Sequence, residues 1–168
     1  IYTTTDTLSL HDALPIFVCL GNICRSPTAD AVFGRKVEAL GLQSRLLVDS
    51  AGTGGWHVGE PPDLRSQRHA ARRGYDLSPL RARQVAADDF RRFDFILAMD
   101  RDNLAELERM RPRGHAGELD LFLRYGSGSR GLEVPDPYYG GEQGFEEVLD
   151  LIEEAADGLL AHLRRTRL

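Results

Sequence analysis

The chain has 168 residues, of which 42% are hydrophobic, and this is the size of one domain with a single core. Its formal net charge of -5 excludes the clustered positive charge by which proteins gather nucleic acid. No run approaches the roughly 18 apolar residues that span a bilayer, and the N-terminus lacks the basic and apolar regions of a secretory signal. We therefore expect a cytoplasmic protein with neither nucleic acid nor a membrane as its partner.

Residues 1–15 differ in character from the rest of the chain. They are rich in Thr, Ser and Asp and show neither alternation nor a helical stripe, and residues 7–16 resemble translated adaptor read-through. We predict that residues 1–15 are a non-native N-terminal segment and that residues 16–168 form the domain. A short genuine arm is the alternative.

The folded pattern begins with a continuous apolar run at residues 16–20, which is typical of a strand buried on both faces. A loop at 21–27 follows, and apolar residues then recur at helical spacing until Gly41, a residue suited to the left-handed position after a helix. The apolar stripe of this predicted helix is Ala29, Val32, Phe33, Val37 and Leu40.

Further strands alternate with helices along the chain. Asp100 follows the third strand and can cap the helix after it. The remaining elements are predicted as strands at 46–48, 95–99 and, more weakly, 119–123, a turn-rich segment at 49–62, a helix at 65–73 and a long loop at 126–144.

The last helix is the clearest amphipathic segment, and we expect it to seal one face of the sheet. Strands that alternate with helices imply right-handed crossovers and a parallel sheet. The sequence therefore predicts an α/β fold, a single three-layer domain whose four-stranded parallel, Rossmann-like sheet carries helices on both faces. The expected buried positions of the last helix are Phe145, Val148, Leu149, Ile152, Ala155, Ala156, Leu159, Leu160 and Leu163.

The loop after the first strand has the composition of a phosphate cradle. Backbone N–H groups in such a turn, together with the N-terminus of the next helix, attract a dianion at the carboxyl end of the strand. Cys19 begins this loop, where the positive field stabilises its thiolate as a nucleophile. Arg25, six residues later, can clamp two phosphate oxygens with its planar guanidinium.

Other residues of the loop fit the same role. Gly21 and Asn22 tolerate the positive φ of a curled loop, and Ser26 can donate its hydroxyl to the Cys19 sulfur. The alternative is a buried structural cysteine beside a solvated arginine. Two thiols and scattered histidines make no ligand set, so we expect no metal and no cofactor. The predicted substrate-binding residues of the loop are Leu20, Gly21, Asn22, Ile23, Cys24 and Ser26.

Residues 17–33, FVCLGNICRSPTADAVF, resemble the phosphate-loop signature of the low-molecular-weight protein tyrosine phosphatases. Four further blocks agree in order, at 49–53, 81–84, 98–100 and 136–138. The resemblance covers the chain from Ile16 to the last helix. It implies hydrolysis of phosphotyrosine through a cysteinyl-phosphate on Cys19. It also implies phosphotyrosine proteins as partners, with a bacterial tyrosine kinase as one candidate, and a monomer or weak dimer.

Asp136 matches the general acid of the family, which protonates the departing tyrosinate and then activates water. Pro137 restrains Asp136 toward an extended backbone, and a loop can carry this carboxyl over an anion site. Tyr138 and Tyr139, with Trp56 on the facing loop, can form the walls of a pocket for a phenyl ring. Alternatively, these aromatic side chains are partly exposed plugs of the core.

Cys24 resembles the second loop cysteine of the family, which traps the oxidised nucleophile as a reversible disulfide; its alternative role is small apolar packing. One position departs from the family pattern. Leu80 stands where many bacterial relatives have a histidine that helps a serine like Ser50 to brace the phosphate loop. Because leucine cannot hydrogen-bond, we expect a weakened brace around Asn22 and Ser26.

Three other functions stay open. Arsenate reductases resemble this chain but use a later cysteine pair, and no cysteine follows Cys24. A related branch that removes phosphate from arginine tends to carry Thr where this loop has Ile23. A binding module for phosphotyrosine without turnover would not need Cys19, Arg25 and Asp136 together.

Overall fold

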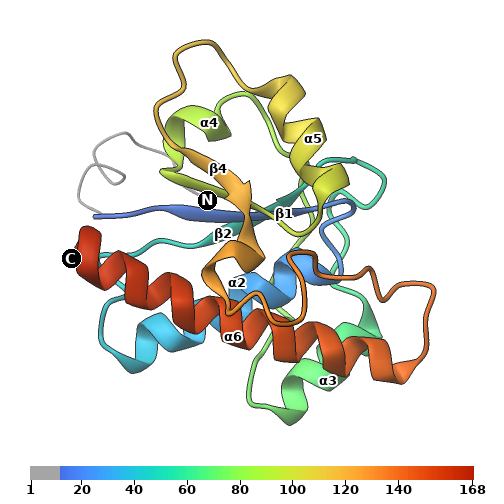
Figure 1. The fold of residues 1–168 in the computed structure, drawn as a ribbon. Coiled ribbons are helices and arrows are strands. Elements are labelled where there is room, and N and C mark those ends of the chain that lie inside the picture. Colours follow the sequence, from blue (N-terminus) through green and yellow to red (C-terminus); the bar gives the residue numbers. More distant parts are fainter. Residues whose placement is uncertain (1–11) are drawn as a thin grey trace.

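The computed structural model describes residues 12–168, which fold around one parallel sheet (Figure 1). The strand order is β2-β1-β3-β4, and each neighbouring pair is parallel. This confirms the predicted α/β fold with a four-stranded parallel sheet. The strands are β1 (Pro15–Cys19), β2 (Asp49–Gly52), β3 (Phe95–Ala98) and β4 (Glu118–Leu121).

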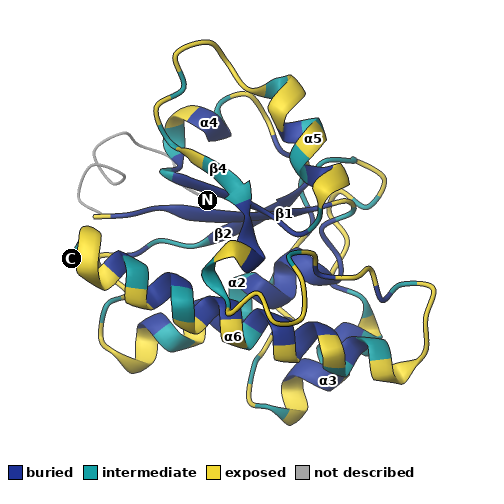
Figure 2. Ribbon diagram, viewed as in Figure 1, coloured by how far each residue is buried: buried dark blue, intermediate teal, exposed yellow. Residues whose placement is uncertain are grey.

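Helices cover both faces of the sheet because both faces of β1 are apolar (Figure 2). Phe17 and Cys19 pack into one buried cluster with α2, α3 and α6, whereas Ile16 and Val18 pack into a second cluster with α4 and α5. A continuous apolar run is what such a doubly covered strand requires. The helices are α2 (Arg25–Ala39), α3 (Leu64–Arg72), α4 (Asp89–Arg92), α5 (Arg101–Met110) and α6 (Glu142–Thr166), with a 3-10 turn η1 (Phe122–Tyr125).

The helix predictions agree closely with the structure. All nine predicted core positions of α6 are buried, and this long helix packs against α2 on one face of the sheet. Gly41 has a φ of 69° directly after α2, as expected. Asp100 caps α5 by accepting a hydrogen bond from the Asn103 N–H. Leu40 is an exception because α2 ends at Ala39, which leaves the leucine 46% exposed.

The second strand lies further along the chain than the sequence predicted. Residues 46–48 were expected to form it, but Leu46 makes only an isolated bridge to Ala13. The strand is β2, inside the segment that its glycine and polar residues had marked as turns. Small side chains suit this position: a Cβ on Gly52 would lie 2.8 Å from the Leu20 carbonyl oxygen of the phosphate loop.

The predicted non-native segment falls largely on residues 1–11, which lie outside the described residues. Its last residues take part in the fold: Ala13 is buried, Asp12 pairs with Arg45, and Pro15 begins β1. The boundary between residues 15 and 16 stays a prediction. Within residues 12–168, no helix has the length and apolar character needed to cross a membrane.

Candidate active site

The loop between β1 and α2 curls back on itself beneath Cys19. Asn22 adopts a φ of 57°, the left-handed conformation predicted for this loop. Gly21 does not share this conformation; a Cβ there would lie 3.0 Å from the His57 ring, so a larger residue would have to displace that side chain. The α2 helix begins at Arg25, so the positive end of its dipole faces the loop.

The Cys19 sulfur is buried and receives two polar contacts. Its Sγ lies 3.0 Å from Ser26 Oγ and 3.3 Å from the Asn22 backbone N–H, which donates to it. Asn22 Nδ2 already donates to Ser26 Oγ, so the serine hydrogen can point either at the sulfur or at the Ala51 carbonyl, which lies 3.3 Å away. The Asn22 N–H and the Ser26 hydroxyl can therefore both donate to this sulfur.

Arg25 is held by two loops that are distant in the sequence. Its Nη1 donates to Asp100 Oδ2 at 2.5 Å and to the Val134 carbonyl at 3.1 Å, while Nη2 lies 3.5 Å from Asp136 Oδ2. Sequence reasoning gave Asp100 only its role as a helix cap. The signal was available in the matching block 98–100, but nothing local indicated that this carboxylate orients the arginine.

These side chains meet at a cavity of about 340 Å³. The structure places Asn22 and Ser26 outside its lining, since their buried side chains bond to one another behind the loop. His57, which sequence reasoning assigned to no site, lies at the cavity and bonds to Glu60. Among the described residues, the lining consists of Cys19, Leu20, Gly21, Ile23, Cys24, Arg25, Trp56, His57, Asp136, Tyr138 and Tyr139.

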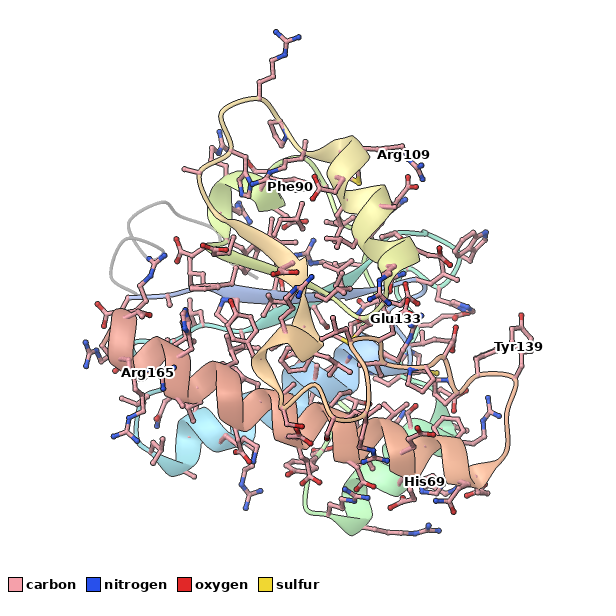
Figure 3. The ribbon with its side chains drawn as sticks, viewed as in Figure 1. His69, Phe90, Arg109, Glu133, Tyr139 and Arg165 are labelled. Atoms are coloured by element: carbon pink, nitrogen blue, oxygen red, sulfur yellow. The ribbon has the colours of Figure 1, made fainter. Side chains whose placement is uncertain are left out.

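The three predicted aromatic walls differ in burial. Tyr138 is partly buried and packs against Ile23, Cys24 and Phe145. Trp56 is 72% exposed and Tyr139 is 93% exposed, so neither plugs the core, and Tyr139 points outward from its loop (Figure 3). Tyr138 therefore forms a wall of the cavity, whereas Trp56 and Tyr139 lie at its exposed rim.

The expected weakness of the phosphate-loop brace does not occur. Asn22 Nδ2 donates to Ser26 Oγ at 2.8 Å and to Ser50 Oγ at 3.1 Å, while Asn22 Oδ1 accepts from the Arg83 N–H at 2.9 Å. The Arg83 backbone thus occupies one acceptor site of Asn22 without help from Leu80. A buried amide with its donors and acceptor paired is well held.

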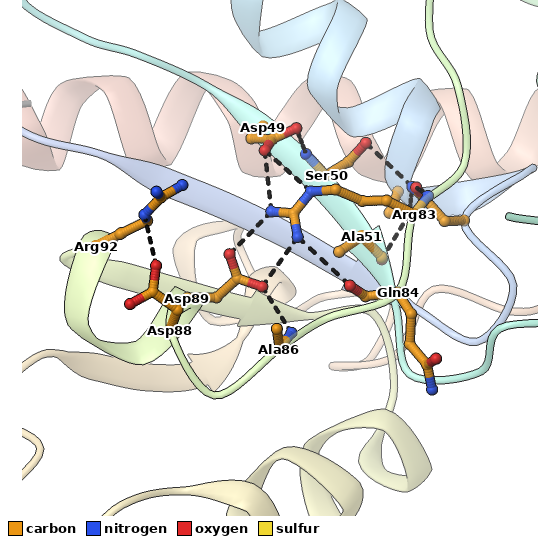
Figure 4. Close-up of polar contacts among 11 residues, drawn as sticks. Asp49, Ser50, Ala51, Arg83, Gln84, Ala86, Asp88, Asp89 and Arg92 are labelled. Carbon is orange, nitrogen blue, oxygen red and sulfur yellow. Dashed lines mark hydrogen bonds and ion pairs between the residues drawn. The ribbon is translucent and has the colours of Figure 1, made fainter. Parts of the chain in front are cut away.

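Arg83 is itself fixed by two buried carboxylates (Figure 4). Its guanidinium contacts Asp49 Oδ2 and Asp89 Oδ1, each at 3.0 Å, in the bidentate geometry that arginine favours. Ser50, on the other side, faces the partly buried Asp30. Burial and the Asp49 carboxylate raise the pKa of Asp30 to about 7.

This carboxyl makes stability depend on pH. Because the pKa of Asp30 lies above its unfolded value of about 3.9, its stabilising proton is fully present below pH 4 and is lost as pH rises through 7. Asp30→Asn mimics the protonated form and should stabilise the protein by about 1 kcal/mol at pH 8 and not at pH 4. Urea unfolding of both proteins at the two pH values measures this, and equal differences would contradict it.

Cys24 differs from Cys19 in its surroundings. It is free and buried, and this burial raises the pKa of the Cys24 thiol to about 12. It packs with Ile23, Ala82 and Phe145 as a small apolar residue. Cys24 is therefore a protonated thiol within the loop between β1 and α2.

Residues 15–168 match the family described as "Low molecular weight phosphotyrosine protein phosphatase". The low molecular weight protein-tyrosine-phosphatase of Streptomyces coelicolor is 48% identical over 151 residues, covering 88% of this chain and 92% of that protein. YfkJ of Bacillus subtilis, of the same description, is 41% identical and covers 90% of this chain and 96% of that protein.

Solved structures agree with these relatives. The protein tyrosine phosphatase of Entamoeba histolytica superposes with a TM-score of 0.88 at 39% identity, covering 93% of this chain and 99% of that chain. A Drosophila arginine phosphatase superposes with a TM-score of 0.84 at 34% identity, covering 89% of this chain and 97% of that chain. With its phosphate loop, clamped arginine and loop aspartate, this chain belongs to the low molecular weight phosphotyrosine protein phosphatase family.

Proposed function

We propose that this protein-tyrosine phosphatase works through Cys19 as nucleophile, Arg25 as phosphate clamp and Asp136 as general acid. The observation that carries the proposal is their convergence on one cavity: Cys19, Arg25 and Asp136 all line it, although Asp136 comes from a distant loop. Leu20, Gly21, Ile23 and Cys24 line the same cavity and supply its base.

In the first step, the Cys19 thiolate attacks phosphorus in line with the tyrosine oxygen. The S–P bond forms as the P–O bond breaks, and Asp136 gives its proton to the departing tyrosinate. Arg25 replaces its contact with Asp136 by contacts to the phosphoryl oxygens, while Asp100 and the Val134 carbonyl keep the guanidinium aimed at the cavity.

In the second step, water attacks the cysteinyl-phosphate. Asp136, now a carboxylate, takes a proton from the water as its oxygen bonds to phosphorus and the S–P bond breaks. The departing thiolate is received by the Ser26 hydroxyl and the Asn22 N–H. The products are inorganic phosphate and the free enzyme.

The walls of the cavity favour an aromatic phosphomonoester. Tyr138 and Ile23 present apolar surface between the loop and the rim, which suits a phenyl ring rather than the short chain of phosphoserine. Arsenate reduction would need a later thiol pair, and the sequence has none after Cys24. The Drosophila arginine phosphatase keeps phosphoarginine as the second candidate substrate.

A substrate panel tests this assignment. Phosphotyrosine, phosphoarginine and phosphoserine peptides of one sequence should be hydrolysed with kcat/KM highest for phosphotyrosine, by at least about tenfold. Cys19→Ser measures the background for each peptide, and arsenate reduction is assayed in parallel. A higher kcat/KM for phosphoarginine, or arsenate reduction at a comparable rate, would overturn the assignment.

Two further properties complete the proposal. Cys24 forms a disulfide with oxidised Cys19 and so protects it from higher oxidation, since both described cysteines are free and flank one loop. Such a thiolate works where thiols stay reduced, which supports the cytoplasm as its compartment. Its partners there are phosphotyrosine proteins, with a bacterial tyrosine kinase as a candidate, and it acts as a monomer or weak dimer.

A further inference from the structure

The α3 helix touches both loops that meet at the cavity. Its capping residue Asp63 donates its backbone N–H to the Ile23 carbonyl of the phosphate loop at 2.8 Å. The same Asp63 accepts hydrogen bonds from the N–H groups of Arg65 and Ser66, which fixes the start of the helix. This helix is therefore tied directly to the loop that carries Cys19.

Arg65 joins α3 to the acid loop, residues 134–141, which carries Asp136. Its Nη2 donates to the Tyr138 carbonyl at 2.9 Å, and the guanidinium lies 5.5 Å from the centre of the Tyr138 ring. Two contacts to Asp63, at 3.0 and 3.2 Å, hold the guanidinium in place. Asp136 itself is less restrained, because its side chain is 40% exposed.

His69, one turn further along α3, holds the end of the acid loop. It is 2% exposed, and its Nε2 lies 2.5 Å from Glu142, the first residue of α6 (Figure 3). Its Nδ1 contacts Glu146 on the next turn of α6, and its ring stacks on Phe145 with the ring centres 5.5 Å apart. Phe145 in turn packs with Tyr138 and the loop residue Ile23.

The charges around His69 explain why it holds this position. Both ring nitrogens lie within hydrogen-bond distance of carboxylate oxygens, Nε2 of Glu142 and Nδ1 of Glu146. Arg73 contacts Glu146 from the other side at 2.8 Å, and Arg68 lies 3.7 Å from Glu142. Hydrogen bonds from Arg73 and His69 hold the pKa of Glu146 below its usual value.

The acid loop is thus anchored at both ends. At its start, the Val134 N–H donates to the Met99 carbonyl at the end of β3. At its end, the Gly140 N–H donates to the Pro137 carbonyl at 3.1 Å, and a Cβ on Gly144 in the first turn of α6 would lie 3.6 Å from the Pro137 side chain. Asp136 directly precedes Pro137, so its position at the cavity depends on where α6 begins.

We infer that His69 is a positioning residue for the general acid: through Glu142 it sets where α6 begins and so where the acid loop holds Asp136. Arg65 assists at Tyr138, and α3 as a whole fixes the spacing between the phosphate loop and the acid loop. The inference rests on the proposed role of Asp136 as the acid. If His69 only supported folding, its loss would lower kcat/KM by the same factor for every substrate. If it positions the general acid, its loss would lower kcat/KM most for substrates whose leaving group needs a proton.

The test compares kcat/KM for aryl phosphates whose leaving phenolates differ in basicity. His69→Phe keeps the stack on Phe145 but loses both hydrogen bonds, and Glu142→Ala removes the partner from the exposed side. Both variants should lose about tenfold on the most basic leaving group and less than about twofold on the least basic. His162→Phe is the matched control, a histidine of α6 that also packs on aromatic rings and contacts Phe95 and Tyr125.

Each outcome has a distinct meaning. Asp136→Asn is measured with the same substrates. If its loss of kcat/KM did not grow with the basicity of the leaving group, the proposed role of Asp136 as the acid would be wrong. The loss of kcat/KM could instead grow with leaving-group basicity for Asp136→Asn but be equal across the substrates for His69→Phe and Glu142→Ala. That result would overturn only the positioning role. Urea unfolding of each variant confirms that the measured protein is folded, and Glu142→Ala decides if His69→Phe does not fold.

Discussion

Replacing Cys19 with serine is expected to lower kcat/KM for phosphotyrosine peptides by on the order of 10⁴-fold or more. In the proposed mechanism the sulfur is the atom that bonds phosphorus, and a serine hydroxyl in its place is a much weaker nucleophile. Binding should survive, because Arg25 keeps its contacts with Asp100 and Val134. Steady-state kinetics and calorimetric titration with the same peptide measure the two effects.

A covalent intermediate gives an independent check. Rapid acid quenching of the wild type during turnover should trap one phosphoryl group on Cys19, visible by mass spectrometry of the peptide that contains residues 19–25. Cys24→Ser is the matched control, because it removes the other thiol of the loop and should still trap the phosphoryl group. If the trapped phosphoryl group were lost in Cys24→Ser and kept in Cys19→Ser, the nucleophile would be Cys24.

Replacing Asp136 with asparagine is the second large effect. We expect kcat/KM to fall about 10²- to 10³-fold for aryl phosphates with basic leaving groups, and much less for those that leave without a proton. Asparagine keeps the size of the side chain and an oxygen that can still accept from the Tyr138 N–H, so the loop should stay in place. Steady-state kinetics with a series of aryl phosphates measure how kcat/KM changes with the basicity of the leaving group.

The control for this prediction is a neighbouring acid that lies outside the cavity lining. Glu133 precedes the acid loop and instead accepts a hydrogen bond from the Arg101 N–H at 2.9 Å (Figure 3). Glu133→Gln should leave the dependence on the leaving group unchanged. If Asp136→Asn retained the wild-type dependence, or Glu133→Gln lost it, the acid would have to be another carboxyl.

Local periodicity was enough to predict the elements whose signals do not depend on a partner. The apolar residues 16–19 need cover on both faces wherever they lie, and the stripe of α6 has one hydrophobic side that must be buried. The spacing of Cys19 and Arg25 on a strand-loop-helix unit indicated the phosphate cradle for the same reason. One continuous segment contains all the residues that form it.

The second strand could not be predicted in this way. Asp49, Ser50, Ala51 and Gly52 have low strand propensity, and they form β2 because β1 offers a row of parallel hydrogen-bonding partners. The strand was predicted at the neighbouring residues 46–48 because they are more apolar. Strand formation here is decided by the neighbouring strand rather than by the segment itself.

The sequence by itself determined the α/β class and the family, because each depends on the order of local patterns along the chain and not on which distant side chains meet. Only the tertiary structure decided which distant groups complete the site: Asp100 on Arg25, the Arg83 N–H on Asn22, and His69 on Glu142. These contacts join segments separated by dozens of positions. Their geometry follows from how the helices pack on the sheet, which no local pattern of residues specifies.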